Sequence, residues 1–190
     1  MDKSHNSKSA LLVIDMQNGL FNAESKPCNH QLILSNILKL IEHHRLNNRP
    51  IIFVRHVGDK NTPLDPDSPN TQLIADLSFN SDKDFVIEKT YPSSFKNTDL
   101  KELLERLDIK QIIVTGMKTE YCIDTTIRAA SEIGYKIMVA SEIGYKIMVA
   151  SDAHTTFDSI HLSAQYIIDH HNQIFRNAFA KVNTTEELIS

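Results

Sequence analysis

The sequence predicts an α/β protein built on a parallel sheet that helices cover on both faces. Short apolar runs such as LLVI and IIFV recur along the chain, and they are typical of strands buried on both faces. Segments with apolar residues at helical spacing alternate with these runs, as expected where helices connect parallel strands. The chain has 190 residues and no evident linker, so we expect a single domain over residues 1–190.

The first part of the chain begins with a predicted strand at residues 9–14 (SALLVI). Apolar residues at helical spacing predict a helix over 32–44, which asparagine and proline residues then end. Residues 51–54 (IIFV) form the second predicted strand. A loop rich in Pro, Asp and Asn is expected over 58–70, and a short helical stretch near 73–77.

The middle of the chain contains two further predicted strands, at residues 85–87 and 111–114 (QIIV). A helix over 100–107 separates them. Asp99 and Glu102 have the spacing of a capping box, which indicates where this helix begins.

The last part of the chain continues the alternation of helices and strands. A helix after the fourth strand is indicated by apolar residues on one face, and a strand ending in IMVA follows it. We then expect a helix around 160–170 and a short apolar stretch at 179–182. Thr184 and Glu187 predict a capped final turn of helix.

Composition excludes several classes of function. A net charge of −4 favours neither nucleic acid nor an anionic membrane as partner, and no apolar run approaches the roughly 20 residues of a membrane span. Residues 1–10 lack the apolar core of a secretory signal, and two cysteines do not form a disulfide framework, so we expect a cytoplasmic protein. A Cys28–Cys122 disulfide stays open, although the two cysteines lie in different contexts, a polar loop and a strand-to-helix junction.

Three chemically capable residues follow predicted strands. Asp15 follows the first strand, Lys89 ends the third (FVIEK), and Cys122 lies just past the fourth, at the start of a helix. In open parallel sheets, ligands bind beyond the carboxyl ends of the strands, so these residues are expected at one edge. Each also has a structural explanation, as a helix cap, a solvated lysine and a small buried hydrophobe, but their convergence favours function.

Together these residues predict covalent catalysis. A helix start and the ammonium of Lys89 would both favour the thiolate of Cys122, the nucleophilic form of cysteine. Asp15 could take the thiol proton and later pass it to a leaving amine. Backbone N–H groups of the turn before Cys122 could hold the oxyanion, which suits attack on an amide-like carbon.

At these residues the chain resembles the isochorismatase-like cysteine hydrolases. The family's signatures appear in order as LLVIDMQ with Asp15, EKTYPSSF with Lys89 and TGMKTEYCIDTT with Cys122, and the resemblance runs from about residue 9 to 157. It implies a three-layer α/β/α fold with a six-stranded, mostly parallel sheet, and a triad of Cys122, Asp15 and Lys89. It also implies a small-molecule substrate and, because members commonly associate, a homo-oligomer.

The same resemblance implies details around the cysteine. A non-proline cis peptide would join Met117 and Lys118, and the backbone amides of Lys118 and Cys122 would form the oxyanion hole. A small residue commonly follows that bond in the family, so Lys118 predicts a more basic pocket. His56, Phe21, Phe95 and Tyr121 are candidate pocket residues. A lone histidine at the end of a strand is more often structural, and each of the three aromatic residues fits the core at least as well as the pocket.

A metal is not expected. Nicotinamidases of this family carry one Asp and several His after the second strand, whereas FVRHVGDKNTPLDPD here has His56 but no Asp-x-His pattern. We therefore expect no metal and no other cofactor, and the segment disfavours nicotinamide as substrate. Isochorismatases cleave a vinyl ether without needing the thiol, so an intact Cys122 favours hydrolysis of an amide or ureide.

The segment SEIGYKIMVA occurs twice in succession, at residues 131–140 and 141–150, where the family pattern has one copy. The second copy joins directly to Ser-Asp-Ala, so we expect it to supply the strand while the first lengthens the preceding helix. In the alternative, the first copy forms the strand and the second loops out, which would expose several large apolar residues.

The leading hypothesis is a metal-free cysteine hydrolase that cleaves a C–N bond through an acyl-enzyme. In it Cys122 is the nucleophile, Asp15 the general base and acid, and Lys89 the electrostatic partner. A second hypothesis is a non-covalent, isochorismatase-like hydrolysis that depends on Asp15. A third is a binding or assembly module that keeps the fold without catalysis.

Overall fold

The computed structural model describes residues 8–133 and 146–190. It contains a six-stranded sheet with the order β3-β2-β1-β4-β5-β6. Every neighbouring pair of strands is parallel, which confirms the predicted fold class. The strands are β1 (Ser9–Ile14), β2 (Ile51–His56), β3 (Phe85–Lys89), β4 (Gln111–Met117), β5 (Lys146–Thr155) and β6 (Lys181–Asn183).

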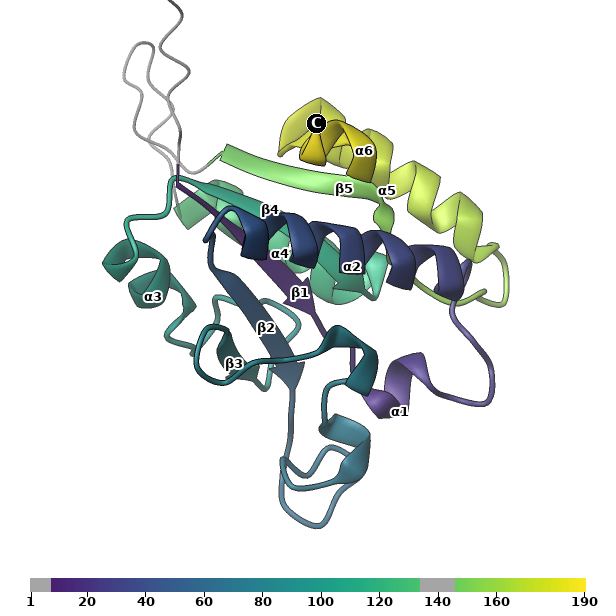
Figure 1. Cartoon of the computed structure of the whole chain (residues 1–190). Coiled ribbons are helices and arrows are strands. Elements are labelled where there is room, and N and C mark those ends of the chain that lie inside the picture. The colour runs from purple at the N-terminus through teal and green to yellow at the C-terminus, as the bar shows by residue number, and fades with distance from the viewer. Residues whose placement is uncertain (1–7, 134–145) are drawn as a thin grey trace, which may run out of the picture.

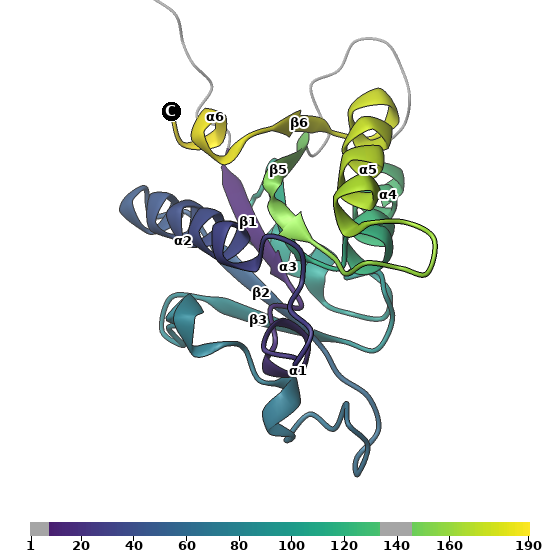
Figure 2. The same ribbon diagram turned by 90° about the vertical axis from the view of Figure 1, so that its right-hand side faces the viewer.

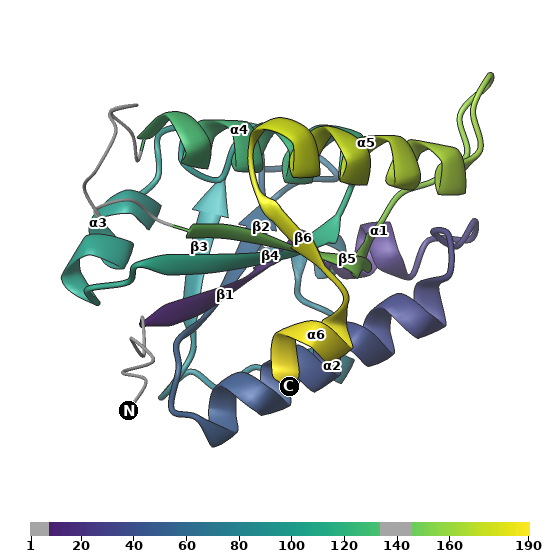
Figure 3. The same ribbon diagram turned by 90° about the horizontal axis from the view of Figure 1, so that it is seen from above.

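Helices cover both faces of this sheet, as Figures 2 and 3 show from two directions. On one face lie α3 (Leu100–Arg106), α4 (Asp124–Ile133) and α5 (Ala164–Ala178), whose apolar residues share one core cluster with strand residues. On the other face lie α1 (Asn18–Phe21), α2 (His30–Leu46) and α6 (Thr185–Ile189), which contribute to a second cluster. Along β1, Ala10, Leu12 and Ile14 belong to the first cluster and Leu11 and Val13 to the second, because successive strand residues point to opposite faces of the sheet.

The central strands are buried on both faces. All six residues of β1 are buried, and β1 pairs with β2 on one side and β4 on the other. Because all these strands run in one direction, their carboxyl ends meet at one edge, beside α1 and the loop that follows β2 (Figure 1). The sequence pattern of continuous apolar runs reflects this two-sided burial.

The connection from β4 to α4 departs from a simple turn. β4 is longer than the predicted 111–114 and includes Gly116, which has a φ of 113°; a Cβ there would lie 2.1 Å from the carbonyl oxygen of Ile14. Only glycine fits this close approach of two backbones. A cis peptide bond joins Met117 to Lys118, and a π-helical turn, η3 (Thr119–Ile123), leads into α4.

Two local predictions were wrong. Asp99 makes no side-chain hydrogen bond at the start of α3, so the predicted capping box is not formed. The helix expected around 160–170 begins only at Ala164, where Ser163 caps it, and Ile160 before it is 94% exposed. The hydroxyl of Ser163 accepts the N–H of Tyr166, a local start signal stronger than the apolar residues preceding it. At α6 the capping box of Thr184 and Glu187 is confirmed.

The repeated segment is partly described. β5 contains residues 146–150, so the second copy supplies the strand, as predicted. α4 includes the first three residues of the first copy, Ser131 to Ile133. The predicted lengthening of that helix falls on residues 134–145, outside the described part of the chain.

The short helical stretch predicted near 73–77 corresponds to the 3-10 helix η2 (Ala75–Leu77), and another 3-10 helix, η1 (Pro69–Thr71), precedes it. Among the described helices, none is both long enough and apolar enough to cross a membrane. The described cysteines, Cys28 and Cys122, are both free thiols.

Candidate active site

Asp15 is placed by the end of β1. Its φ is 54°, a left-handed conformation that turns the chain out of the strand, while its N–H still donates to the carbonyl oxygen of Val54 at 2.9 Å. Only 1% of its side chain is exposed, and Oδ1 has no hydrogen-bond partner in the described structure. One carboxylate oxygen is therefore free to accept a proton or a hydrogen bond.

Lys89 ends β3 with a side chain that is 0% exposed. Its Nζ lies 2.9 Å from Oδ2 of Asp15, 3.0 Å from Nδ1 of His56 and 3.2 Å from Sγ of Cys122. An ammonium has three N–H donors and no acceptor, so each donor meets one of these groups. These three contacts explain how the positive charge of Lys89 is tolerated in a buried position. The side chain reaches Asp15 even though β3 and β1 are separated by β2 in the sheet.

His56 ends β2, next to Lys89 in the register of the sheet. Because the ammonium of Lys89 can only donate, Nδ1 of His56 accepts and the ring proton is on Nε2. Burial, and then the positive charge of Lys89, lower the pKa of His56, which favours this neutral form. His56 therefore offers an N–H donor toward the cavity that it lines.

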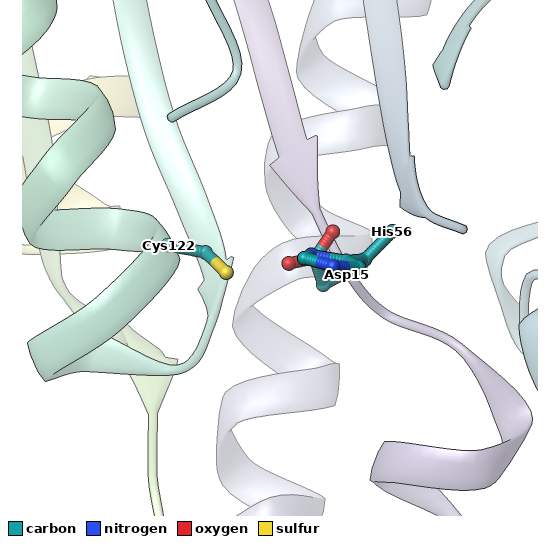
Figure 4. A group of neighbouring side chains, drawn as sticks. All are labelled: Asp15, His56 and Cys122. Atoms are coloured by element: carbon teal, nitrogen blue, oxygen red, sulfur yellow. The ribbon is translucent and has the colours of Figure 1, made fainter. Parts of the chain in front are cut away.

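Cys122 comes from η3, on the opposite side of the site. Figure 4 shows its sulfur and the carboxylate of Asp15 pointing toward each other, with His56 beside Asp15. Asp15, Lys89 and Cys122, which were expected at one sheet edge, are thus brought together, and the ammonium of Lys89 contacts the other two.

The protonation state of Cys122 is the reverse of the sequence prediction. Burial, followed by the negative charge of Asp15, raises the pKa of the thiol to about 12, and these effects outweigh the ammonium of Lys89. The cysteine also lies within a π-helical turn before α4 rather than at the start of α4 itself. Burial likewise raises the pKa of Asp15, with the charge of Lys89 opposing it. The resting cysteine is a protonated thiol next to a carboxylate.

The ammonium of Lys89 lies among three side chains that could otherwise bind a metal ion. The ligand atoms of Asp15, His56 and Cys122 lie within 4.8 Å of one another, a spacing that a metal ion could accept. However, Nζ of Lys89 is within hydrogen-bonding distance of all three residues and supplies the positive charge there. The donor set is therefore that of an ammonium, and it does not fit an additional metal ion.

A cavity of about 460 Å³ opens above these side chains. Asp15, His56 and Cys122 line it together with Gln17, Gly19, Leu20, Pro63, Leu64, Asn70, Thr71, Pro92, Lys118 and Tyr121. Of the pocket candidates from the sequence, His56 and Tyr121 lie here. Phe21 packs in the core on the α2 face and Phe95 packs against the opposite core, so these two are placed elsewhere.

Gln17 holds this site together, although the sequence analysis did not single it out. Its Nε2 donates to the carbonyl oxygens of His56 (3.0 Å) and Thr71 (2.7 Å), and its Oε1 accepts the N–H of His56 at 2.9 Å. Arg55 also donates to the carbonyl of Thr71, at 3.1 Å. These contacts fix the loop after β2, which supplies Pro63, Leu64, Asn70 and Thr71 to the cavity. The sequence did offer a signal for this role, because Gln17 is the last residue of the LLVIDMQ motif that contains Asp15.

The turn around the cis peptide also borders the cavity. Lys118 and Cys122, whose amides were predicted to form an oxyanion hole, both line it. The carbonyl oxygen of Lys118 accepts the N–H groups of Tyr121 and Ile123, each at 3.2 Å, which holds the turn in shape. The side chains of Thr119 and Asn172 bind His154 from its two ring nitrogens, at 2.9 and 3.0 Å, and anchor η3 to β5 and α5.

Comparisons with known proteins define the class. The sequence model described as Isochorismatase domain matches residues 9–187, so the chain belongs to the isochorismatase family of hydrolases.

Two curated relatives and one solved structure show the likeness in detail. The chain is 35% identical over 130 residues to the uncharacterized isochorismatase family protein YddQ of Bacillus subtilis, covering 67% of this chain and 72% of the relative. It is 35% identical over 148 residues to Nicotinamidase 3 of Arabidopsis thaliana, covering 70% and 71%. A cysteine hydrolase from Pseudomonas syringae has a similar structure, with a TM-score of 0.84, 25% identity and coverage of 96% and 91%.

Proposed function

We propose that this protein is a cysteine hydrolase that cleaves a C–N bond of a small amide or ureide, with no metal or other cofactor. Cys122 is the nucleophile, Asp15 the general base and acid, and Lys89 the electrostatic partner. One observation carries the proposal: the buried ammonium of Lys89 contacts both the carboxylate of Asp15 and the sulfur of Cys122 at the floor of a cavity.

The first half-reaction begins from the thiol. With its pKa raised to about 12, Cys122 carries its proton at neutral pH, so deprotonation must accompany attack. Asp15 takes the thiol proton as Sγ bonds to the substrate's carbonyl carbon. The carbonyl oxygen becomes an oxyanion, which the N–H groups of Lys118 and Cys122 stabilise. When the C–N bond breaks, Asp15 returns its proton to the leaving nitrogen.

The second half-reaction clears the acyl group. Asp15, again a carboxylate, takes a proton from water as the water oxygen bonds to the thioester carbon. The C–S bond then breaks, the sulfur recovers the proton from Asp15, and a carboxylic acid or carbamic acid leaves. Lys89 contacts both groups and moderates the negative charge that passes between Asp15 and Cys122.

The relatives support this reaction class. One similar protein is a nicotinamidase, and one similar structure is that of a cysteine hydrolase. The segment after the second strand lacks the Asp-x-His metal motif of the nicotinamidase pattern. Nicotinamide itself is therefore disfavoured as the substrate. The homo-oligomer and the cytoplasmic location stay predictions.

A second candidate is a non-covalent hydrolase in which Asp15 alone acts on the substrate. Two observations favour it: the thiol of Cys122 has a raised pKa, and Oδ1 of Asp15 is buried with no hydrogen-bond partner among the described residues. In that enzyme Cys122 would only pack against the site.

Substitutions separate these candidates in an assay of ammonia release from a panel of primary amides and ureides. Covalent catalysis predicts that Cys122→Ser and Asp15→Ala each lower kcat/KM by at least about 1,000-fold, while Cys28→Ser, the matched control, has no effect. Intact-mass analysis of quenched wild type should show an acyl adduct on Cys122. Full activity of Cys122→Ala with loss in Asp15→Ala would instead establish the non-covalent enzyme. Absence of turnover across the panel, together with absence of any acyl adduct on Cys122, would favour the binding module.

A further inference from the structure

Two charged side chains line the cavity in the described part of the chain, and only one of them is paired with an opposite charge of the protein. Among the described lining residues, those bearing charge are Asp15 and Lys118, since His56 is neutral. Lys89 already pairs with Asp15 at 2.9 Å. Within the described structure no carboxylate lies within 4.0 Å of Nζ of Lys118, so its positive charge is not matched by the protein.

The ammonium of Lys118 rests near the cavity between two aromatic rings. Its Nζ is 4.9 Å from the ring centroid of Phe157 and 6.0 Å from that of Tyr121, which lines the cavity. These distances place a cation against ring faces, which stabilise it weakly and leave its N–H donors free for a ligand. The flexible four-carbon stem lets the ammonium reach a group bound in the cavity.

The rest of the wall is largely apolar. Leu20, Pro63, Leu64 and Pro92 line the cavity around the reacting groups. An anion bound among such residues loses water, and its attraction to an ammonium is then stronger than in bulk solvent. A neutral substrate would leave the charge of Lys118 without a counterpart on binding.

We propose that Lys118 binds a carboxylate of the substrate, and that the substrate is an amide or ureide with this carboxylate on a short apolar chain. The proposal rests on the proposed function and adds the class of substrate. Because Lys118 is the single cation among the described lining residues, a monoanion fits better than a phosphate dianion, which usually takes several donors.

Binding to the Cys122→Ser protein tests the anion site without turnover. The probes are the monoamides succinamate, glutaramate and adipamate, each compared by calorimetry with its neutral diamide of the same length. We expect the best monoamide to bind at least about tenfold more tightly than its diamide at low salt, and salt to reduce that preference. Adding Lys118→Met should abolish the preference, whereas Lys118→Arg should retain it.

A matched control removes a lysine of the same kind elsewhere. Nζ of Lys96 lies 4.0 Å from the ring centroid of Tyr91, and neither residue lines the cavity. Lys96→Met should leave the preference for monoamides unchanged. In the enzyme with an intact thiol, Lys118→Met should raise KM for the best monoamide at least about tenfold with little change in kcat.

Each outcome bears on one proposal. Equal binding of monoamide and diamide, tighter binding of the diamide, no binding of any monoamide at millimolar concentration, or a preference that survives Lys118→Met would each overturn the carboxylate site. A preference that depends on Lys118, without hydrolysis of the bound amides, would support the site and count against the proposed function. Hydrolysis without the preference would do the reverse.

Discussion

Removing the charge of Asp15 should make Cys122 more acidic and more reactive toward an alkylating agent, while abolishing turnover. The structure gives the reason, because the negative charge of Asp15 follows burial as a cause of the raised pKa of the thiol. Asp15→Asn keeps the size of the side chain and leaves Lys89, whose ammonium contacts the sulfur at 3.2 Å, without an opposing carboxylate. Loss of the general base should stop hydrolysis even as the thiolate becomes more abundant.

The size of the effect follows from the geometry. Unit charges no more than 4.8 Å apart, as Asp15 and Cys122 are, interact by about 3.5 kcal/mol at an effective dielectric constant of about 20. That energy corresponds to about 2.5 pKa units, so the thiol pKa should fall from about 12 to roughly 9.5. Because a less basic thiolate is also a weaker nucleophile, the alkylation rate near pH 8 should rise by about 25-fold.

The assay is the pH dependence of iodoacetamide alkylation, followed by intact mass in a Cys28→Ser background. Circular dichroism at each pH restricts the analysis to folded protein. Asp108→Asn is the matched control, since Asp108 precedes the opposite end of β4 and pairs with exposed lysines. An unchanged or higher thiol pKa in Asp15→Asn would refute the claim that the carboxylate keeps the cysteine protonated.

Two further predictions concern the stability of the fold around the site. Gly116→Ala should destabilise the protein by about 3 kcal/mol or more in urea unfolding, because its Cβ would lie 2.1 Å from a backbone oxygen at a φ of 113°. Gly58→Ala, whose Cβ would meet only a leucine side chain at 3.0 Å, should cost much less, and equal losses would contradict this argument. Burial lowers the pKa of His154 from 6.5 to about 4 in the folded state, so the unfolded state takes up a proton first as the pH falls. Its contribution to stability, present above pH 6.5, should therefore decline by up to about 3 kcal/mol on approaching pH 4, and His154→Gln should remove that part of the pH dependence.

The arrangement of the elements could be predicted because burial leaves a local pattern. Strands covered on both faces, such as 9–14 and 51–54, must be apolar throughout, and helices covered on one face show helical spacing. Local signals failed where a competing contact was stronger. Ser163 starts α5 after the apolar residues near 160, and Asp99 does not cap α3 despite its spacing.

The sequence by itself determined that Asp15, Lys89 and Cys122 meet, since residues at the carboxyl ends of neighbouring parallel strands share an edge. Tertiary structure alone decided that Lys89 donates to three partners, that His56 is one of them, and that Phe21 and Phe95 lie in the core. It also decided that Cys122 is a protonated thiol. The physical reason is that desolvation and charge interactions depend on segments far apart in the chain, and a local motif records neither their distance nor their burial.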